Sequence, residues 1–331
     1  MNAQDTAPFT APAPTLTGDG AKRQAIADDK PMLRAAVELT QDLTKAQPRI
    51  YWLDMVASAM IGYAGLAGAI LFADPWAAFG AGFISVLALY RALLFIHELT
   101  HIHRDALPGF RLGWNIIVGI PMLMPSFMYE EVHTLHHART RYGTIEDPEY
   151  LPLALMKPWS LPLFLVTAIL LPPALLLRSA LLVPLGAIFP PVRRFVWQRL
   201  SSLAINPDFR RRDPQGQMRR KVFWQELATC VWSLILICSI LLIGWRPLAI
   251  ALVTVSAVAV LNQVRTLVAH LWQNEGDAMT VTAQYLDSVN VPPPGWLAAL
   301  WAPVGLRYHA LHHLLPSMPY HSLGAAHRRL S

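Results

Sequence analysis

The sequence predicts an all-α, polytopic membrane protein in which four transmembrane helices form two hairpins. Of its 331 residues, 54% are hydrophobic, which exceeds the roughly 45–50% of an ordinary soluble domain. Several apolar runs approach the ~20 residues that a helix needs to cross a bilayer. Histidines recur at helical spacing next to these runs. We therefore also expect a re-entrant or interfacial apolar segment and a cytoplasmic helical cap that carries the histidine boxes.

The N-terminal residues 1–30 are rich in Ala, Pro, Thr and Asp and contain no long apolar core. This composition predicts a disordered tail and not a signal peptide. Residues 31–331 are expected to form one membrane domain, beginning with an amphipathic helix over 31–48 that lies on the membrane surface.

Four apolar segments have the length and composition of transmembrane helices. They are expected over 51–72, 76–96, 223–243 and 248–268. Turn residues separate the members of each pair, namely Asp74 and Pro75 in the first and Gly244 to Pro247 in the second. Each pair is therefore expected to fold as a hairpin.

Two further apolar stretches, 107–127 and 151–191, are interrupted by prolines and are expected to be interfacial or re-entrant. Arg178 lies well inside the second stretch, where a charge is unfavourable in lipid. If this stretch returns to the side from which it entered, all the histidine clusters and the C-terminal region 269–331 share one side.

The net charge of +6 comes with basic residues concentrated over 193–221, between the apolar stretch 151–191 and the predicted span 223–243. This pattern suits the positive-inside rule rather than nucleic-acid binding. It predicts that the histidine clusters lie on the cytoplasmic side of the membrane. If the source is bacterial, we expect this membrane to be the inner membrane. The segment could anchor the protein to the membrane surface or dock an acidic electron carrier.

Histidines at i, i+3 and i+4 lie on one face of a helix, so each cluster can direct its imidazoles to one point. Nine histidines are too many for one tetrahedral zinc site and suit two metal ions. An apolar substrate at the lipid boundary would need O2 and a redox metal for oxidation, which favours iron. The predicted ligands are His97, His101, His133, His136, His137, His270, His309, His312 and His313.

Metal-bound imidazoles usually donate their other N–H to a carboxylate or carbonyl. Acidic residues close in sequence to the clusters are therefore candidates for this supporting role: Glu98, Glu130, Glu131, Asp147, Glu149, Glu275 and Asp277. The two cysteines, Cys230 and Cys238, both fall inside an apolar run and are expected to be core residues.

The three histidine boxes resemble those of the membrane fatty-acid desaturase superfamily. They read His97-x-x-x-His101, His133-x-x-His136-His137 and His309-x-x-His312-His313, and the run from Leu311 to His321 is similar to acyl-lipid desaturases. The resemblance extends from about residue 51 to the end of the chain. It implies that the box histidines and His270 hold two irons. Some members carry an Asn four residues before this last ligand; here Thr266 occupies that position and Asn262 lies one turn earlier.

The resemblance also implies an activity. Such enzymes use O2 and two electrons to introduce a double bond into the acyl chain of a membrane lipid, and a separate donor of the ferredoxin or cytochrome b5 type is expected here. Carotenoid or lipid hydroxylases and ketolases of the same superfamily share the boxes, so they form an alternative. A histidine-rich metal transporter is an alternative of another class, but it should place its ligands in the middle of the membrane.

Overall fold

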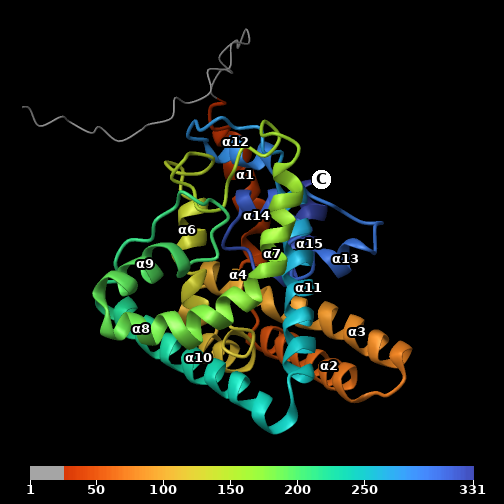
Figure 1. Cartoon of the computed structure of the whole chain (residues 1–331). Helices are drawn as coiled ribbons and strands as arrows, with labels where there is room; N and C mark the ends of the chain where they lie inside the picture. The colour runs from red at the N-terminus through yellow and green to blue at the C-terminus, as the bar shows by residue number, and fades with distance from the viewer. Residues whose placement is uncertain (1–25) are drawn as a thin grey trace, which may run out of the picture.

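The part of the chain that the structure describes, residues 26–331 of a computed structural model, is helical (Figure 1). Strand pairing within that range is limited to two isolated bridges, His270 with Ser288 and Asn290 with Tyr308. The prediction of an all-α fold is confirmed. Most of the predicted N-terminal tail lies outside the described residues.

Within residues 26–331, five helices are long and apolar enough to cross a membrane. They are α2 (Pro48–Leu71), α3 continued by α4 (Pro75–Leu93 and Phe95–His101), α7 continued to the end of α8 (Ser160–Ile188), α10 (Gly216–Ile243) and α11 (Arg246–Ala269). Four of them correspond to the predicted spans. The helix α10 begins at Gly216 rather than near 223. Hydropathy marks only the apolar part of a helix, and α10 also includes the basic residues that precede this part.

Small residues hold the hairpin of α2 and α3 together. A Cβ atom added at Gly65 would lie 2.7 Å from the carbonyl oxygen of Ala81, so only glycine permits this approach. The hydroxyl of Ser85 donates to the carbonyl of Gly62 at 2.8 Å. Close backbone approach of this kind is the usual basis of helix packing in membranes. At the turn, the Asp74 carboxylate accepts from the Ala77 amide at 2.7 Å and caps α3.

The helix over Ser160–Ile188, which does not correspond to a predicted span, is bent. Pro172 and Pro173 lie within α7 (Ser160–Leu177), and a π-helical turn over Arg178–Leu182 joins it to α8 (Val183–Ile188). Figure 1 shows α7 leaving the cap beside α11 and bending into α8, which lies along α10. The following helix α9 (Pro190–Leu200) packs back against α8. A bent path is what the prolines predict, and the four-span count stays a prediction.

The buried charge of Arg178 is neutralised within the protein. Its guanidinium forms an ion pair with Glu226 of α10 at 2.6 Å and donates to the carbonyl of Leu200 and the hydroxyl of Ser201. A buried charge is tolerated when it is paired and hydrogen-bonded in this way. The arginine therefore joins α7, α9 and α10.

The predicted interfacial stretch 107–127 contains no helix of spanning length. The short helix α5 (Phe110–Trp114) continues as a π turn over Asn115–Gly119, and the chain then folds back. The side chain of Asn115 closes this return, because it accepts from the Ser126 amide at 2.8 Å and donates to the Ser126 hydroxyl at 2.9 Å.

The cap lies above the hairpins and contains the remaining helices (Figure 1). These are α1 (Lys30–Thr40), α6 (Val132–His136), α12 (Val281–Asp287), α13 (Ala298–Trp301), α14 (His309–Leu314) and α15 (Tyr320–Leu330). The helix α1 falls within the predicted lead-in segment and packs on α15 through Ala36, Leu323 and Ala326.

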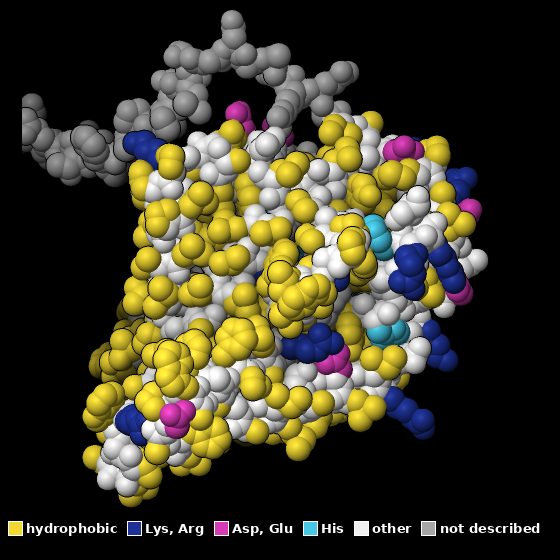
Figure 2. Space-filling model, turned by 90° about the vertical axis from the view of Figure 1, so that its right-hand side faces the viewer, with side chains coloured by type: hydrophobic (Ala, Val, Ile, Leu, Met, Phe, Trp, Pro, Cys, Tyr) yellow, Lys and Arg dark blue, Asp and Glu magenta, His cyan; other side chains and the backbone are white. Residues whose placement is uncertain are grey.

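The surface of the spanning helices is apolar. Leu241 and Leu242 of α10 and Trp76 of α3 are more than 80% exposed. Figure 2 shows hydrophobic side chains covering much of one face, with Lys and Arg gathered toward its right-hand edge. Such a large continuous apolar surface is stable only against lipid. The fold is therefore that of a multi-pass membrane protein.

Candidate metal centre

The nine predicted histidines meet at one place in the cap. They come from four segments that lie far apart in the sequence: α4, α6 with the residue after it, the residue after α11, and α14. Helical periodicity explains the position within each box, whereas the packing of the cap brings the boxes together. Seven of the nine are buried, and His101 and His137 are half-buried.

The histidines form two groups, each of which could hold a metal ion. Within each group the nitrogen atoms that could serve as ligands all lie within 4.8 Å of one another. One group contains His97, His101, His133, His137 and His312, and the other contains His136, His270, His309 and His313.

The spacing of the ring nitrogens fits metal ligation. The Nε2 atoms of His133 and His137 are 3.1 Å apart, and those of His270 and His309 are 3.0 Å apart. Two imidazoles bound to one metal at ~2.0–2.1 Å bring their nitrogens to about this separation. In addition, His97 Nε2 and His101 Nε2 are buried without a hydrogen-bond partner among the described residues. A cation in the first group would satisfy these two atoms.

Three carboxylates fix the imidazoles at their Nδ1 atoms, either directly or through a tyrosine hydroxyl. Asp147 lies 3.0 Å from Nδ1 of His136, and Glu149 contacts Nδ1 of His133. Asp287 accepts from the Tyr142 hydroxyl at 2.8 Å, and that hydroxyl is 2.9 Å from Nδ1 of His270. Contacts of this kind fix the tautomer and orientation of a metal-bound ring.

Sequence reasoning identified Asp147 and Glu149 but missed Asp287 and Tyr142. Neither of the missed residues has a diagnostic spacing from a histidine box. The isolated bridge between His270 and Ser288 brings the end of α12 beside His270, and this pairing has no signal in the sequence.

Other candidate carboxylates lie elsewhere. Glu130 forms ion pairs with Arg111 and Lys221. Glu131 is exposed to solvent and forms an ion pair with Arg211 at 3.6 Å. The structure does not bring these two to the ring nitrogens, because the positive φ of Glu131, 66°, reverses the chain just before α6. Glu275 and Asp277 are exposed to solvent.

Glu98 has a separate role in the cap. It accepts from the Tyr51 hydroxyl and, at 3.1 Å, from the Tyr320 amide. Its other oxygen is 3.7 Å from Nδ1 of His97. The carboxylate therefore ties α4 to α2 and α15 immediately beside a predicted ligand.

Burial keeps most of these imidazoles neutral, which is the form that binds metals. It lowers the pKa of His133, His137, His270, His309, His312 and His313. Burial is the largest single effect on His136 and acts to lower its pKa, but the charge and hydrogen bond of Asp147, together with the charges of Glu149 and Asp287, outweigh burial and raise this pKa. Burial raises the pKa of Glu149 to about 7.

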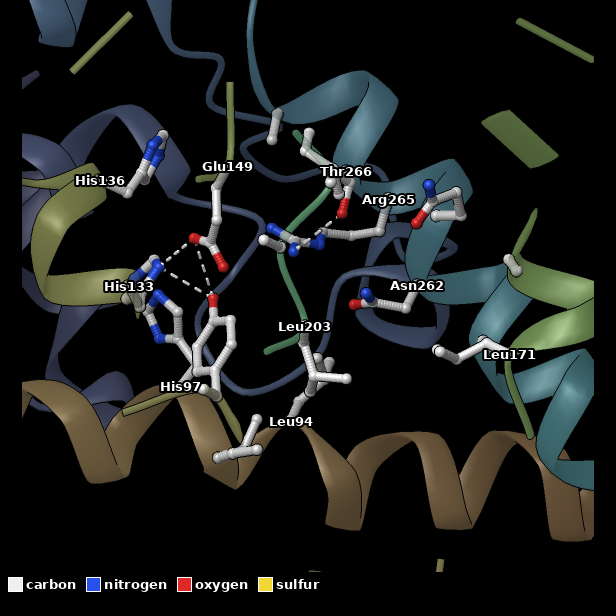
Figure 3. A pocket seen from close by; sticks show the side chains of 18 of the residues that line it. Leu94, His97, His133, His136, Glu149, Leu171, Leu203, Asn262, Arg265 and Thr266 are labelled. Atoms are coloured by element: carbon white, nitrogen blue, oxygen red, sulfur yellow. Dashed lines mark hydrogen bonds and ion pairs between the residues drawn. The ribbon is translucent and has the colours of Figure 1, made fainter. Parts of the chain in front are cut away.

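A cavity of about 360 Å³ adjoins both histidine groups. One end is formed by histidines of both groups, including His97 and His136, while Leu94, Leu171 and Leu203 provide apolar wall (Figure 3). Asn262 and Thr266 also line it, and Arg265, which sequence reasoning did not single out, lies beside them. A cavity of this size falls within the range of small-molecule sites, so it can place part of a lipid against the metal centre.

Comparison with known proteins agrees with this geometry. The fatty acid desaturase family model matches residues 73–331. A ceramide hydroxylase of Caulobacter vibrioides (strain NA1000 / CB15N) is 49% identical over 306 residues, which cover 92% of this chain and 87% of that protein. No solved structure matches the chain. The resemblance carried by the histidine boxes is confirmed, and the chain belongs to the fatty acid desaturase family of membrane oxidoreductases.

Proposed function

We propose that this protein hydroxylates a ceramide in the membrane, using O2, two irons and two electrons from a separate donor protein. The observation that carries the proposal is the 49% identity to a ceramide hydroxylase over nearly the whole of both chains. The histidine boxes are common to desaturases and hydroxylases, so they do not separate the two outcomes. Whole-chain similarity favours the hydroxylase alternative over the double-bond formation expected from the boxes.

The reaction balances with one C–H bond broken and one C–O bond formed. One oxygen atom of O2 enters the lipid as a hydroxyl group, and the other leaves as water after two electrons and two protons are supplied. Two irons, when bound, supply the activation of O2. The nine histidines are the residues that would hold them, and Asp147, Glu149 and Asp287 orient the rings through contacts described above. The leucines that line the cavity exclude water from the reacting carbon.

The electrons must come from another protein, of the ferredoxin or cytochrome b5 type. Both cysteines of this chain lie within α10, away from the histidine groups, so they offer no iron–sulfur site. Exposed basic residues at the end of α9, in the following loop and at the start of α10 offer an acidic carrier a docking surface; they include Arg199, Arg212 and Arg219. By the positive-inside rule, the concentration of basic residues supports a cytoplasmic location for this segment and for the centre.

Mass spectrometry of membrane lipids tests the proposal. Cells that produce the protein should contain ceramide with one additional oxygen atom, and cells without it, or with His136→Ala, should not. Membrane insertion of the variant is the control for folding. Loss of two hydrogens from the lipid would instead establish a desaturase, and loss of metal flux without any change in lipids would establish a transporter.

A further inference from the structure

Arg265 places a buried guanidinium group in the wall of the cavity beside the metal centre (Figure 3). The residue is only 9% exposed. Its Nη2 donates to the hydroxyl of Thr266 at 3.2 Å, and the hydroxyl of Tyr90 lies within its reach. Its Nε is buried with no hydrogen-bond partner among residues 26–331. A buried charge left in this state is unfavourable unless a ligand completes it.

Asn262 adds a second polar group with free hydrogen-bonding capacity. Its amide lines the same cavity and makes no hydrogen bond to any residue that the structure describes. Asn262, Arg265 and Thr266 stand at i, i+3 and i+4, so they share one face of α11. We call this face the polar face of α11. It offers both a cationic donor and an amide that can donate and accept.

The same helix changes from polar to apolar away from the metal centre. Ala259 lines the first cavity, and one to three turns earlier Val255, Leu252 and Leu248 line a second cavity of about 330 Å³. These positions follow one another at intervals of three and four residues, so they continue a single helix face toward the hairpin turn. The second cavity is lined almost entirely by hydrophobic residues, and the neighbouring residues Leu171 and Pro172 line the first and the second cavity respectively.

This arrangement fits an amphipathic lipid whose polar group lies close to the carbon that reacts. The middle of a hydrocarbon chain would leave the donors of Arg265 and Asn262 unpaired in a dry cavity, which opposes binding. A lipid that carries a hydrogen-bond acceptor near the reacting carbon pairs them. Its tail can then follow α11 into the apolar second cavity.

We propose that the polar face of α11 binds the amide group of the lipid, an inference that rests on the proposed function. Arg265 donates to the amide carbonyl oxygen, and Asn262 accepts from the amide N–H or from a neighbouring hydroxyl. Hydroxylation therefore falls on a carbon within a few bonds of the amide, not far along a chain. Arg265 and Asn262 are thus residues that determine substrate and position.

A structural role for Arg265 makes a different prediction. If the guanidinium only balanced the charges of Asp147, Glu149 and Asp287, its removal would weaken the site equally for every lipid. Direct recognition makes the effect depend on whether the lipid has an amide. The two roles are separated by comparing ceramide with a dialkyl ether of equal chain length, which lacks the amide.

Binding is measured on the metal-free, full-length protein, through quenching of tryptophan fluorescence by bromine atoms on the chain of each lipid. Arg265→Met should weaken ceramide binding by at least about tenfold, the usual effect of losing a hydrogen bond to a charged group, and leave ether binding unchanged. Arg265→Lys should fall between the two, because it keeps the charge but not the planar fork. Arg246→Met, at the other end of α11, is the matched control and should bind both lipids as the wild type does.

The position of the new hydroxyl is then mapped by fragmentation of the wild-type product, a measurement that needs no variant to fold. A hydroxyl remote from the amide, or equal losses for both lipids in Arg265→Met, overturns the inference. If the wild-type protein binds ceramide through Arg265 but does not oxidise it, the proposed function fails while recognition of the amide stands.

Discussion

Asp287 holds His270 through the hydroxyl of Tyr142, and this chain of contacts shows how a single residue supports the centre. Without the carboxylate, the hydroxyl loses the acceptor that orients it, and the His270 ring loses its fixed tautomer. Supporting groups of this kind usually contribute about 10–100-fold to metal affinity.

We therefore expect Asp287→Asn to weaken iron binding by about 10–100-fold, measured by competition with a chelator. Glu275→Gln is the control, because Glu275 is exposed and distant from the ring nitrogens. Equal iron affinity for Asp287→Asn and the wild type would show that Tyr142 alone suffices.

The buried imidazoles also predict how the stability of the metal-free protein depends on pH. Burial lowers the pKa of six of these histidines in the folded state, from His133 to His313. The unfolded chain then binds protons first as the pH falls through about 6.5, so stability is lost below that pH. The raised pKa values of His136 and Glu149 act in the opposite direction, but these are two groups against six.

Thermal unfolding of the metal-free protein should therefore show a Tm several degrees lower at pH about 5.5 than at pH about 7.5. A Tm that does not change across this interval would contradict the burial of neutral imidazoles.

The sequence predicts the ligands at the residue scale but not all of their supports. Helical spacing is a local property, so the two His-x-x-His-His boxes can be recognised from the sequence alone. Asp287 and Arg265 act through tertiary contacts, and no spacing connects them to a box. Glu130 and Glu131 precede a box directly, yet a reversal of the backbone at Glu131 turns them toward arginine and lysine.

The hairpin of α2 and α3 depends, at the scale of elements, on one point of close contact. A Cβ at Gly65 would lie 2.7 Å from the Ala81 carbonyl oxygen and 2.9 Å from the Ser85 nitrogen. Both are backbone atoms, so the helices must separate to admit a side chain there.

Gly65→Ala should destabilise the protein by about 1–3 kcal/mol, the usual result of overpacking. Gly80→Ala is the matched control, since nothing lies within 4 Å of its added Cβ, and it should stabilise α3 by about 0.5–1 kcal/mol. Unfolding in detergent micelles measures both. The same sign for both variants would contradict the packing described.

Hydropathy locates the spanning helices well, because each of the four predicted spans lies within or close to a long helix. It does not describe the path of residues 160–188. That path depends on the prolines of α7 and on the ion pair of Arg178 with Glu226, and the partner on α10 is a tertiary contact that composition does not reveal.

The meeting of all nine histidines constrains the topology of the whole molecule. Boxes before and after residues 160–188 contribute to the same centre, and α10 and α11 form a hairpin between them. We therefore expect the segment 160–188 to cross the membrane an even number of times or not at all, which is the parity that the sequence predicts.

Cysteine labelling in sealed vesicles tests this topology in a background without Cys230 and Cys238. Thr140→Cys and Asp213→Cys, both exposed and on either side of the segment, should react from the same side, and Ala73→Cys at the hairpin turn should react from the other. Labelling of the first two positions from opposite faces would overturn the four-span topology.

The division of the histidines between the two groups has a consequence for how the enzyme is made. Each group takes ligands from both halves of the chain: His312 completes the first, and His136 contributes to the second. Neither half can therefore assemble a complete site by itself. Metal ions can complete both groups only after the chain has been synthesised through His313, so metal binding joins the two halves late in biogenesis.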